Sequence, residues 1–408
     1  MVKDSALSQD ERLSTLERWL RDDAKWLVLL IGGLAFARRA YLATHGKGID
    51  FAPVWLAGRA FLHGMPPYNV ALYVYPPASL VVLSPLATLP YALAQAVFAI
   101  VNATAILAGS LLLLQAFNLD WRSWAVPSLL LTLAIFIPVQ TTLDFGNING
   151  LIYLGESVFV LMLMRQRWVL AGTSLGVSLM LKPVLLPLVV ILVIQRQWKA
   201  GMLAVGIPVL ASAAVLLMVK NPASYFTHTL PFLFSQVGPE NVSVKGILDR
   251  IAAPGLVTVA ARLIAAACAV GAFLWVWLGG RGSFKHVALV GILLSAAFLV
   301  SSPSWPYYGL YLLPSIVGVL VVPGAGRATI ATVLVGAVLI GMPNVPALIR
   351  DPGFGFTVEH ARFTLGFATL LAAATIWVRP SAVRTQLAAV GTRDAQQVAR
   401  EPTATTYR

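Results

Sequence analysis

A carboxylate that follows the first apolar stretch is the residue best suited to chemistry in this sequence. Asp50 stands just after that stretch and precedes Phe51–Pro53, an aromatic residue, an alanine and a proline. Asp and Glu together make up only 16 of the 408 residues. Acidic residues at a membrane are costly, so one that is kept there is a functional candidate. Because a carboxylate at a membrane surface can deprotonate a hydroxyl group, Asp50 is predicted to be a catalytic base.

Each of the acidic residues could also have a purely structural role. Asp50 together with Pro53 also fits the start of a surface helix, because Asp caps helices well and Pro suits the first turn. Asp144 lies in a Gly- and Asn-rich stretch, Leu143–Gly150, where a turn is favoured over a substrate contact. Glu156 falls inside an apolar stretch and is expected to be paired for structural reasons.

Cations on the same predicted face provide the opposite charge. Lys182 lies between two apolar runs and precedes Pro183. A fixed ammonium there suits a phosphate as a point charge, although a lysine snorkelling to the interface is the alternative. The residues predicted to help on the same face are Arg59, His63, His228 and Lys245.

Tyrosines at a second helix junction suit a sugar. Tyr307 and Tyr308 follow the turn-like stretch Ser301–Pro306. Each tyrosine offers a ring face and a hydroxyl group, which together fit a sugar ring. The alternative is an aromatic belt at the membrane surface, which is favoured for Trp305.

Motifs that the sequence lacks narrow the chemistry. It has no Walker A sequence, no His-Glu-x-x-His and no dinucleotide-binding fingerprint. It also has no Asp-x-Asp pair for the metal of a nucleotide sugar. A sugar donor would therefore be carried on a lipid and used without metal. Cys268 is the one cysteine, which excludes a disulfide framework and a cysteine-based metal site.

The elements that position these residues are membrane helices. Hydrophobic residues make up 58% of the chain and charged residues 11%, whereas a soluble domain has about 25% charged residues. The net charge of +13 comes from short Lys and Arg clusters between apolar spans, which indicates membrane topology and not nucleic-acid binding. The apolar runs are near 26–43, 91–117, 124–140, 150–164, 200–218, 256–279, 287–302, 306–322, 326–342 and 361–378.

Residues 168–194 are ambiguous as a span. Arg165 and Arg167 on one side and Arg196 and Lys199 on the other all favour the cytoplasm. Two half-length helices that meet at Lys182 and Pro183 satisfy both signals, provided that protein or a watery cavity covers their broken ends. We therefore expect an all-α polytopic membrane protein with about 12 transmembrane segments and both termini in the cytoplasm.

Segment boundaries follow from the same patterns. Residues 1–24 are predicted to be a cytoplasmic segment, 25–378 the transmembrane domain and 379–408 a disordered cytoplasmic tail. Two extracytoplasmic loops, 46–90 and 219–255, are expected to hold short helices on the membrane surface. Arg38 and Arg39, near the outer end of the first span, require snorkelling or a functional partner.

Taken together, these motifs resemble glycosyltransferase family 87, whose members use polyprenyl-phosphate sugars and have the membrane-embedded GT-C fold. The resemblance covers most of residues 46–315. It is carried by Asp50, Trp55, Ala57–Arg59, Pro67 and Tyr68, Tyr75–Pro77, Pro85 and Leu86, and Leu89 and Pro90.

Within the family, the chain looks most similar to the arabinofuranosyltransferases that form α-1,3 branches in actinobacterial arabinan. The residues behind this are Asp50 and Phe51 with Pro53, Asn147–Gly150, Glu156, Leu181–Pro183, Arg196–Trp198, Ser224–Thr227 and Thr229–Pro231. Two departures are that Ile49 stands where the arabinosyl relatives have a second Asp, and that the chain matches poorly after Tyr308.

The resemblance implies an inverting, metal-independent enzyme without a cofactor. Its donor would be decaprenyl-phosphoryl-arabinose and its acceptor an arabinan or lipoglycan, at the extracytoplasmic face of the plasma membrane among membrane lipids. It implies Asp50 as base, with Lys182, Arg59 and Lys245 for the donor phosphate. The substrate-binding residues would be Trp55, Tyr75, Asp144, Asn147, Asn149, His228, Tyr307 and Tyr308.

Two other functions stay open at this point. One is an α-1,2-mannosyltransferase that uses polyprenyl-phosphomannose. The other is a flippase or transporter of lipid-linked sugars, which would use acidic residues near the middle of the bilayer, whereas Asp50 and Asp144 are predicted near one face.

Overall fold

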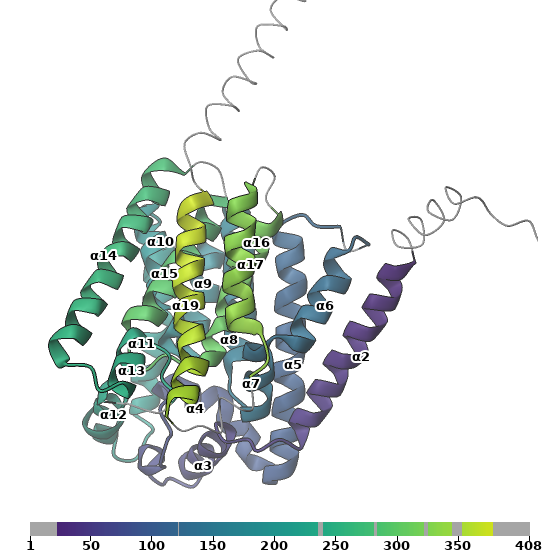
Figure 1. The fold of residues 1–408 in the computed structure, drawn as a ribbon. Helices are drawn as coiled ribbons and strands as arrows, with labels where there is room; N and C mark the ends of the chain where they lie inside the picture. Colours follow the sequence, from purple (N-terminus) through teal and green to yellow (C-terminus); the bar gives the residue numbers. More distant parts are fainter. Residues whose placement is uncertain are drawn as a thin grey trace, which may run out of the picture.

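Every regular element of the computed structural model is a helix within the residues that it describes, which are 23–120, 122–235, 240–280, 284–321, 325–344 and 353–377. The long helices lie side by side as a bundle (Figure 1). The all-α membrane fold is therefore confirmed. The predicted segment 1–24 lies outside the described residues except for Asp23 and Ala24, and the predicted tail 379–408 lies wholly outside them.

The first half of the chain forms both long and short helices. They are α2 (Ala24–Thr44), α3 (Phe51–Leu62), η1 (Pro67–Asn69), α4 (Pro77–Leu83), η2 (Ser84–Thr88), α5 (Tyr91–Ala116), α6 (Ala125–Ile135), α7 (Ile137–Phe145), α8 (Asn149–Met164), α9 (Trp168–Leu181), η3 (Pro183–Leu188), α10 (Val189–Ile194) and α11 (Trp198–Leu216).

The second half continues the bundle. Its elements are η4 (Tyr225–Thr229), α12 (Leu230–Ser235), α13 (Val244–Arg250), α14 (Gly255–Gly279), α15 (Phe284–Val300), η5 (Pro306–Leu312), α16 (Leu313–Val321), α17 (Arg327–Gly341) and α19 (Phe354–Trp377).

Short helices gather at one end of the bundle. In Figure 1, α3, α4, α12 and α13 lie together at the end opposite to the start of α2 and the end of α19. They belong to loops 46–90 and 219–255, where short helices were expected. The start of the first long helix, α2, and the end of the last, α19, therefore lie at the end of the bundle away from these loops.

Helix lengths agree with a membrane protein. Four described helices, α2, α5, α11 and α14, are long and apolar enough to cross a membrane, and the bent pair of α6 and α7 adds a fifth span if counted as one. Several shorter apolar helices of 10–17 residues accompany them. The number of about 12 transmembrane segments stays a prediction.

Two breaks shape the bundle near its short-helix end. The predicted span 124–140 is wrong as a single helix, because α6 and α7 meet at Phe136 with a bend of 55°. A proline ring clashes with the carbonyl four residues earlier, so Pro138 ends the first helix at this point. The Gln140 side chain donates to that carbonyl, on Ala134, at 2.9 Å and satisfies it.

The second break lies at Lys182, as the sequence predicted. Lys182 has an extended backbone, with φ −158° and ψ 129°, between α9 and η3. A residue before proline is disfavoured in the helical region, so Pro183 accounts for this break. Because Lys182 is extended, its side chain does not continue the side-chain positions of α9.

Close packing of α5 on α8 fixes the start of α8. A Cβ added to Gly150 would meet the side-chain oxygen of Asn102, on α5. The Asn102 amide also donates to the Asn147 carbonyl at 2.8 Å. This contact anchors the turn between α7 and α8, where several of the predicted site residues lie.

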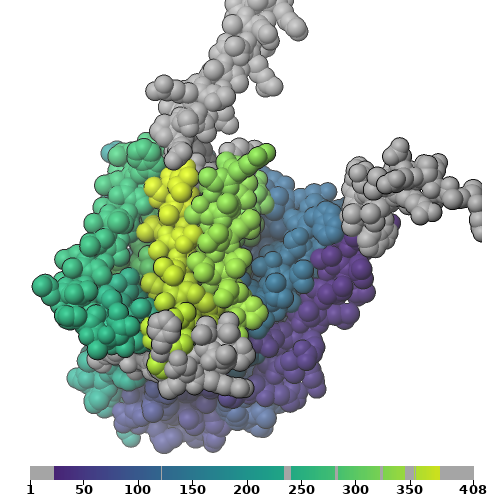
Figure 2. Space-filling model, in the orientation of Figure 1, coloured from purple at the N-terminus to yellow at the C-terminus, as the bar shows by residue number. Residues whose placement is uncertain are grey.

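The outer helices expose large apolar side chains. On α14, Leu256 is 82% exposed and Leu278 is 75% exposed, and Leu210 on α11 is 72% exposed. Figure 2 shows α14 standing at one side of the molecule. Apolar surfaces of this size fit contact with lipid tails.

Candidate active site

Asp50 is held at the start of α3 by the turn that precedes α8. Its backbone N–H donates to the Phe145 carbonyl at 2.9 Å. Its carboxylate oxygen Oδ2 accepts a hydrogen bond from Nδ2 of Asn147 at 2.7 Å. The side chain makes no capping hydrogen bond to α3. The carboxylate of this half-buried residue thus faces the α7–α8 turn and does not serve as the helix cap.

Asn147 connects this carboxylate to a cation. While its Nδ2 donates to Asp50, its Oδ1 accepts from Nζ of Lys182 at 3.5 Å. The backbone N–H of Asn149 donates to the same Oδ1 at 3.2 Å. If the Asn147 amide were flipped, its NH₂ group would face the Lys182 ammonium and the Asn149 N–H, which are both donors. These two partners therefore fix the NH₂ group on the side of Asp50. Asp50 and Lys182 therefore lie at opposite ends of one amide.

The Lys182 ammonium is bonded to amide oxygens and surrounded by rings. It donates to Oδ1 of Asn149 at 3.1 Å. It lies 4.9 Å from the ring centroid of Tyr308 and 5.2 Å from that of Tyr307, both within cation–π range. Among the described residues no carboxylate lies within 4.0 Å of it. Its charge can therefore serve an anionic group of a substrate.

Buried tyrosines complete this cluster. The ring centroid of Tyr75 lies 6.0 Å from the Lys182 ammonium. The hydroxyl of Tyr311 donates to Oδ1 of Asn149 at 2.7 Å and so shares that oxygen with Lys182. The structure thus brings together seven of the predicted site residues, which are joined by direct contacts or by shared partners. They are Asp50, Tyr75, Asn147, Asn149, Lys182, Tyr307 and Tyr308.

Burial affects the titration of the carboxylate. It raises the pKa of Asp50 above the usual aspartate value of 3.8. The Asn147 hydrogen bond and the Lys182 charge each act to lower that pKa, but burial is the larger effect. A raised pKa makes a carboxylate a stronger base, which suits proton abstraction from a hydroxyl group.

Arg59 and Trp55 lie in a separate groove. The Arg59 guanidinium lies 4.9 Å from the Trp55 ring centroid, and the Trp55 indole donates to the Leu89 carbonyl at 3.1 Å. Both residues line an open groove of about 570 Å³ with His63 and Pro90. In the described residues no hydrogen bond, ion pair or cation–π contact joins Arg59 or Trp55 to Lys182 or Asp50.

Three other predicted residues have partners elsewhere. Asp144 forms an ion pair with Arg39 at 2.6 Å, which gives Arg39 the partner that its position required. Lys245 forms an ion pair with Asp249 one turn later on α13. The exposed His228 contacts the hydroxyl of Thr227 through its ring nitrogen. The structure does not bring these residues into the Asp50–Lys182 cluster.

Glu156 does not have the partner that was expected. It is fully buried on α8, and both of its carboxylate oxygens lack a hydrogen-bond partner among the described residues. The expectation of structural pairing is therefore wrong. No ion pair of Glu156 is present in the part of the chain that the structure describes.

Sequence reasoning missed several residues near the site. Asn102 supports Asn147, and Tyr311 supports Asn149. A polar amide in the middle of the apolar run 91–117 was a signal for Asn102. Arg250, on α13, was also missed: its three guanidinium nitrogens are buried and have no hydrogen-bond partner in the part of the chain that the structure describes.

No group of three or more His, Cys, Asp or Glu side chains in the described residues is arranged to hold a metal ion. The metal-independent chemistry expected from the sequence stays a prediction.

Comparisons with known proteins agree on a family. The family description "Glycosyltransferase family 87" matches residues 73–303. An α-(1→3)-arabinofuranosyltransferase of Mycobacterium tuberculosis is 34% identical over 298 residues, which cover 69% of this chain and 68% of the relative. A protein of the same name from Corynebacterium glutamicum is 30% identical over 302 residues, covering 69% of this chain and 70% of the relative.

Two more distant similarities accompany these. A polyprenol-phosphate-mannose-dependent α-(1-2)-phosphatidylinositol pentamannoside mannosyltransferase of Mycobacterium tuberculosis is 26% identical and covers 79% of this chain and 75% of its own length. The crystal structure of ArnT from Cupriavidus metallidurans bound to undecaprenyl phosphate has a TM-score of 0.41 and 17% identity, covering 93% of this chain and 81% of that one. A likeness at that score says nothing of the site.

Proposed function

The chain belongs to glycosyltransferase family 87, and we propose that it is an arabinofuranosyltransferase that forms α-1,3 branches in arabinan. It is a membrane glycosyltransferase, and its relatives with 30–34% identity are named as arabinofuranosyltransferases. The proposed donor is decaprenyl-phosphoryl-arabinose, used without metal or cofactor, and the proposed acceptor is an arabinan or lipoglycan.

One observation carries this proposal. A half-buried carboxylate and an ammonium that has no carboxylate partner among the described residues are bound to the two ends of the Asn147 amide. A lipid-phosphate sugar needs a base for the acceptor hydroxyl on one side and a cation for the phosphate on the other. The Asp50–Lys182 pair supplies both groups with a fixed separation.

The proposed reaction is a single displacement. The acceptor hydroxyl oxygen forms a bond to the anomeric carbon as the bond from that carbon to the phosphate oxygen breaks. The hydroxyl proton passes to the Asp50 carboxylate, and the bonding electron pair leaves with the lipid phosphate, whose charge Lys182 stabilises. Attack opposite to the leaving group inverts the configuration, so a β-linked donor gives an α-linked product.

The proposed location is the plasma membrane, with the site on its extracytoplasmic face. The positively charged loops predicted to be cytoplasmic support this orientation, since Lys and Arg are enriched on the cytoplasmic side. The short helices α3, α4, α12 and α13 would then lie on the outer membrane surface.

A direct assay tests the proposed function. Purified protein in lipid nanodiscs is given labelled decaprenyl-phosphoryl-arabinose or polyprenyl-phosphomannose with a short arabinofuranose or mannose acceptor. We expect label transfer from the arabinose donor alone, with linkage analysis showing an α-1,3 product. Transfer from the mannose donor alone would replace the proposal by an α-1,2-mannosyltransferase, the alternative that the mannosyltransferase relative favours.

The same assay separates an enzyme from a transporter. A flippase would move the labelled donor across the bilayer of a vesicle without forming a new glycosidic bond. Movement of the donor without any product would overturn the enzymatic proposal.

A further inference from the structure

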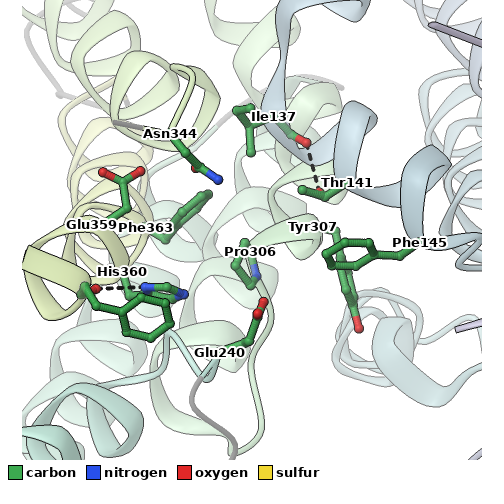
Figure 3. Close-up of a pocket in the computed structure, with 11 residues that line it drawn as sticks. Ile137, Thr141, Phe145, Glu240, Pro306, Tyr307, Asn344, Glu359, His360 and Phe363 are labelled. Atoms are coloured by element: carbon green, nitrogen blue, oxygen red, sulfur yellow. Dashed lines mark hydrogen bonds between the residues drawn. The ribbon is translucent and has the colours of Figure 1, made fainter. Parts of the chain in front are cut away.

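A second polar cavity lies against the Asp50–Lys182 cluster. It has a volume of about 130 Å³ and is formed by α7, η5, α19 and two loops. Tyr307 belongs to both sites, since its ring lies beside the Lys182 ammonium and also lines the cavity. Figure 3 shows its side chains converging from three directions. The lining includes Thr141, Glu240, Tyr307, Asn344, Glu359 and His360.

The cavity offers mainly hydrogen-bond acceptors. Nδ1 of His360 lies 2.9 Å from the Phe356 carbonyl, so this nitrogen carries the proton and the ring's other nitrogen is an acceptor. Glu240 adds a carboxylate, which Figure 3 shows on the side of His360 that faces away from that bond. A ligand with several hydroxyl groups can donate to these acceptors.

One wall of the cavity is rigid. Arg362 donates to Glu359 at 2.7 Å, to the Leu339 carbonyl at 2.8 Å and to Oδ1 of Asn344 at 2.6 Å. These bonds fix the Asn344 amide with its oxygen occupied, so its NH₂ group can donate to a ligand. The cavity can thus give and receive hydrogen bonds at defined positions.

Charges around the cavity balance. Glu240 and Glu359 are negative, whereas Arg362 is positive and Arg250 stacks on the Phe356 ring at 4.8 Å. Burial raises the pKa of Glu240, the Arg250 charge opposes this and the nearby Asp50 charge adds to it. Because these cations do not outnumber the nearby carboxylates, the cavity favours a neutral ligand over a phosphate.

Apolar ring faces complete the chemistry of a sugar site. Phe356, Phe363 and Tyr307 line the cavity between its polar groups. Aromatic faces pack against the C–H side of a sugar ring, while hydroxyl groups at its edge find polar partners. The volume has room for one ring and not for a chain of them.

We infer that this cavity binds one neutral sugar residue of the acceptor, next to the Asp50 carboxylate. That the sugar belongs to the acceptor rests on the proposed function. That the ligand is a neutral sugar rests on the chemistry of the cavity. Lys182 then serves the anionic donor and the cavity the uncharged acceptor, with Tyr307 between the two.

Steady-state kinetics with each substrate varied in turn provide the first test. Glu240→Gln replaces one acceptor oxygen of the carboxylate with an NH₂ group, and Asn344→Ala removes the side-chain amide from the cavity. We expect the KM for the acceptor to rise about 10-fold, as for the loss of one hydrogen bond to a charged or fixed group, with the donor KM unchanged. The control is Thr369→Ala, also on α19, whose hydroxyl donates to the Leu365 carbonyl of the same helix. An unchanged acceptor KM in both variants would overturn the inference.

A binding experiment gives an answer that does not depend on transfer. Saturation-transfer NMR with octyl arabinofuranoside and octyl mannoside reports contact between protein and sugar. We expect wild-type protein to bind a sugar, Thr141→Trp to lose binding by filling the cavity, and inorganic phosphate not to compete. Donor KM or thermal unfolding checks that Thr141→Trp is folded, and Glu240→Gln provides a milder second variant.

The outcomes separate the two proposals. Sugar binding that disappears in the filled variant, in a protein without any transfer, would refute the proposed function and keep the assignment of the cavity. Sugar binding that persists in Thr141→Trp and Glu240→Gln, displacement by phosphate, or no binding by wild-type protein would refute the cavity assignment itself.

Discussion

At the scale of single residues, the site depends on how the Asp50 carboxylate is held. It accepts one hydrogen bond from Asn147 and is partly buried beside the Lys182 charge. These contacts orient the carboxylate without neutralising it by a direct ion pair. Each of the following substitutions removes one part of this arrangement.

Asp50→Asn should remove the base and keep the fold. Asn has the same shape and its side-chain oxygen can still accept from Asn147, so donor binding should persist. We expect kcat to fall by about 10²–10⁴-fold, the usual contribution of a general base. The measurement is label transfer at saturating donor, with the unfolding temperature as control. Near-normal turnover would exclude Asp50 from this role.

The pH dependence of kcat/KM should report the same carboxylate. A base acts when deprotonated, so activity falls as the pH drops through its pKa, and burial puts that midpoint above 3.8. The Asn147 hydrogen bond lowers the pKa of Asp50, so Asn147→Ala should move the acidic limb to higher pH. Thr369→Ala serves as the unshifted reference. A limb that moves to lower pH in Asn147→Ala contradicts the assignment.

Lys182→Met should weaken the interaction with the donor phosphate. Loss of one fixed charge at a leaving group typically lowers kcat by about 10²–10³-fold. Lys245→Met gives the comparison, because the Lys245 ammonium is already paired with Asp249, and its effect should be far smaller. Equal losses in the two variants, measured by donor titration, would argue against a special role for Lys182.

At the scale of elements, the site depends on where helices stop. Pro183 follows the extended Lys182, and the turn between α7 and α8 carries both Asn147 and Asn149. The α7–α8 turn in turn rests on α5 through Asn102. Two helix breaks and one tight helix pair therefore determine the distance between the acid and the cation.

The contact of α5 with α8 can be tested by a pair of glycine substitutions. Gly150→Ala would drive a Cβ into the Asn102 side chain and backbone, so we expect a loss of roughly 1–3 kcal/mol of stability and reduced turnover. Gly206→Ala on α11 meets no heavy atom within 4 Å and should gain about 0.5–1 kcal/mol. Unfolding in detergent and transfer rates measure both. Equal stability of the two variants would show that this contact is not tight.

Local signals in the sequence were enough for most helices. The run predicted at 91–117 is α5, and the break predicted at Lys182 is present, because apolar length and a proline each act within a few residues. The bend at Phe136 was missed although Pro138 was visible in the sequence, because the surrounding run is mostly apolar and fits a single span. Asp50 and Lys182 were chosen by charge in an apolar setting, but the amide that joins them was not predictable from spacing.

At the scale of the whole molecule, the polar residues of both sites come from distant parts of the chain. The cavity joins Thr141, Glu240 and His360, which no sequence period relates to one another. Arg59 and Lys245 shared the charge and the predicted face of Lys182, yet only tertiary packing determines which cation faces Asn147. The same packing leaves α11 and α14 with apolar outer faces.

The proposed orientation in the membrane can be tested with single cysteines. Cys268 is the only cysteine of the sequence, so Cys268→Ala provides a clean background. His63 on the C-terminal side of α3 and Arg165 at the end of α8 are both exposed. In intact cells, a membrane-impermeant maleimide should label the protein with His63→Cys and not the one with Arg165→Cys. The reverse pattern would place the Asp50 site on the cytoplasmic side.

The corner between α6 and α7 has a consequence for how ligands are received. The bend deprives the Ala134 carbonyl of its helical hydrogen bond, and the Gln140 side chain replaces that bond. The bent conformation is therefore stable without a bridging water. Thr141 and Phe145 project from the same short helix into the cavity. Their positions are therefore preorganised. A sugar that binds in the cavity does not have to order these side chains, so no affinity is lost to that ordering.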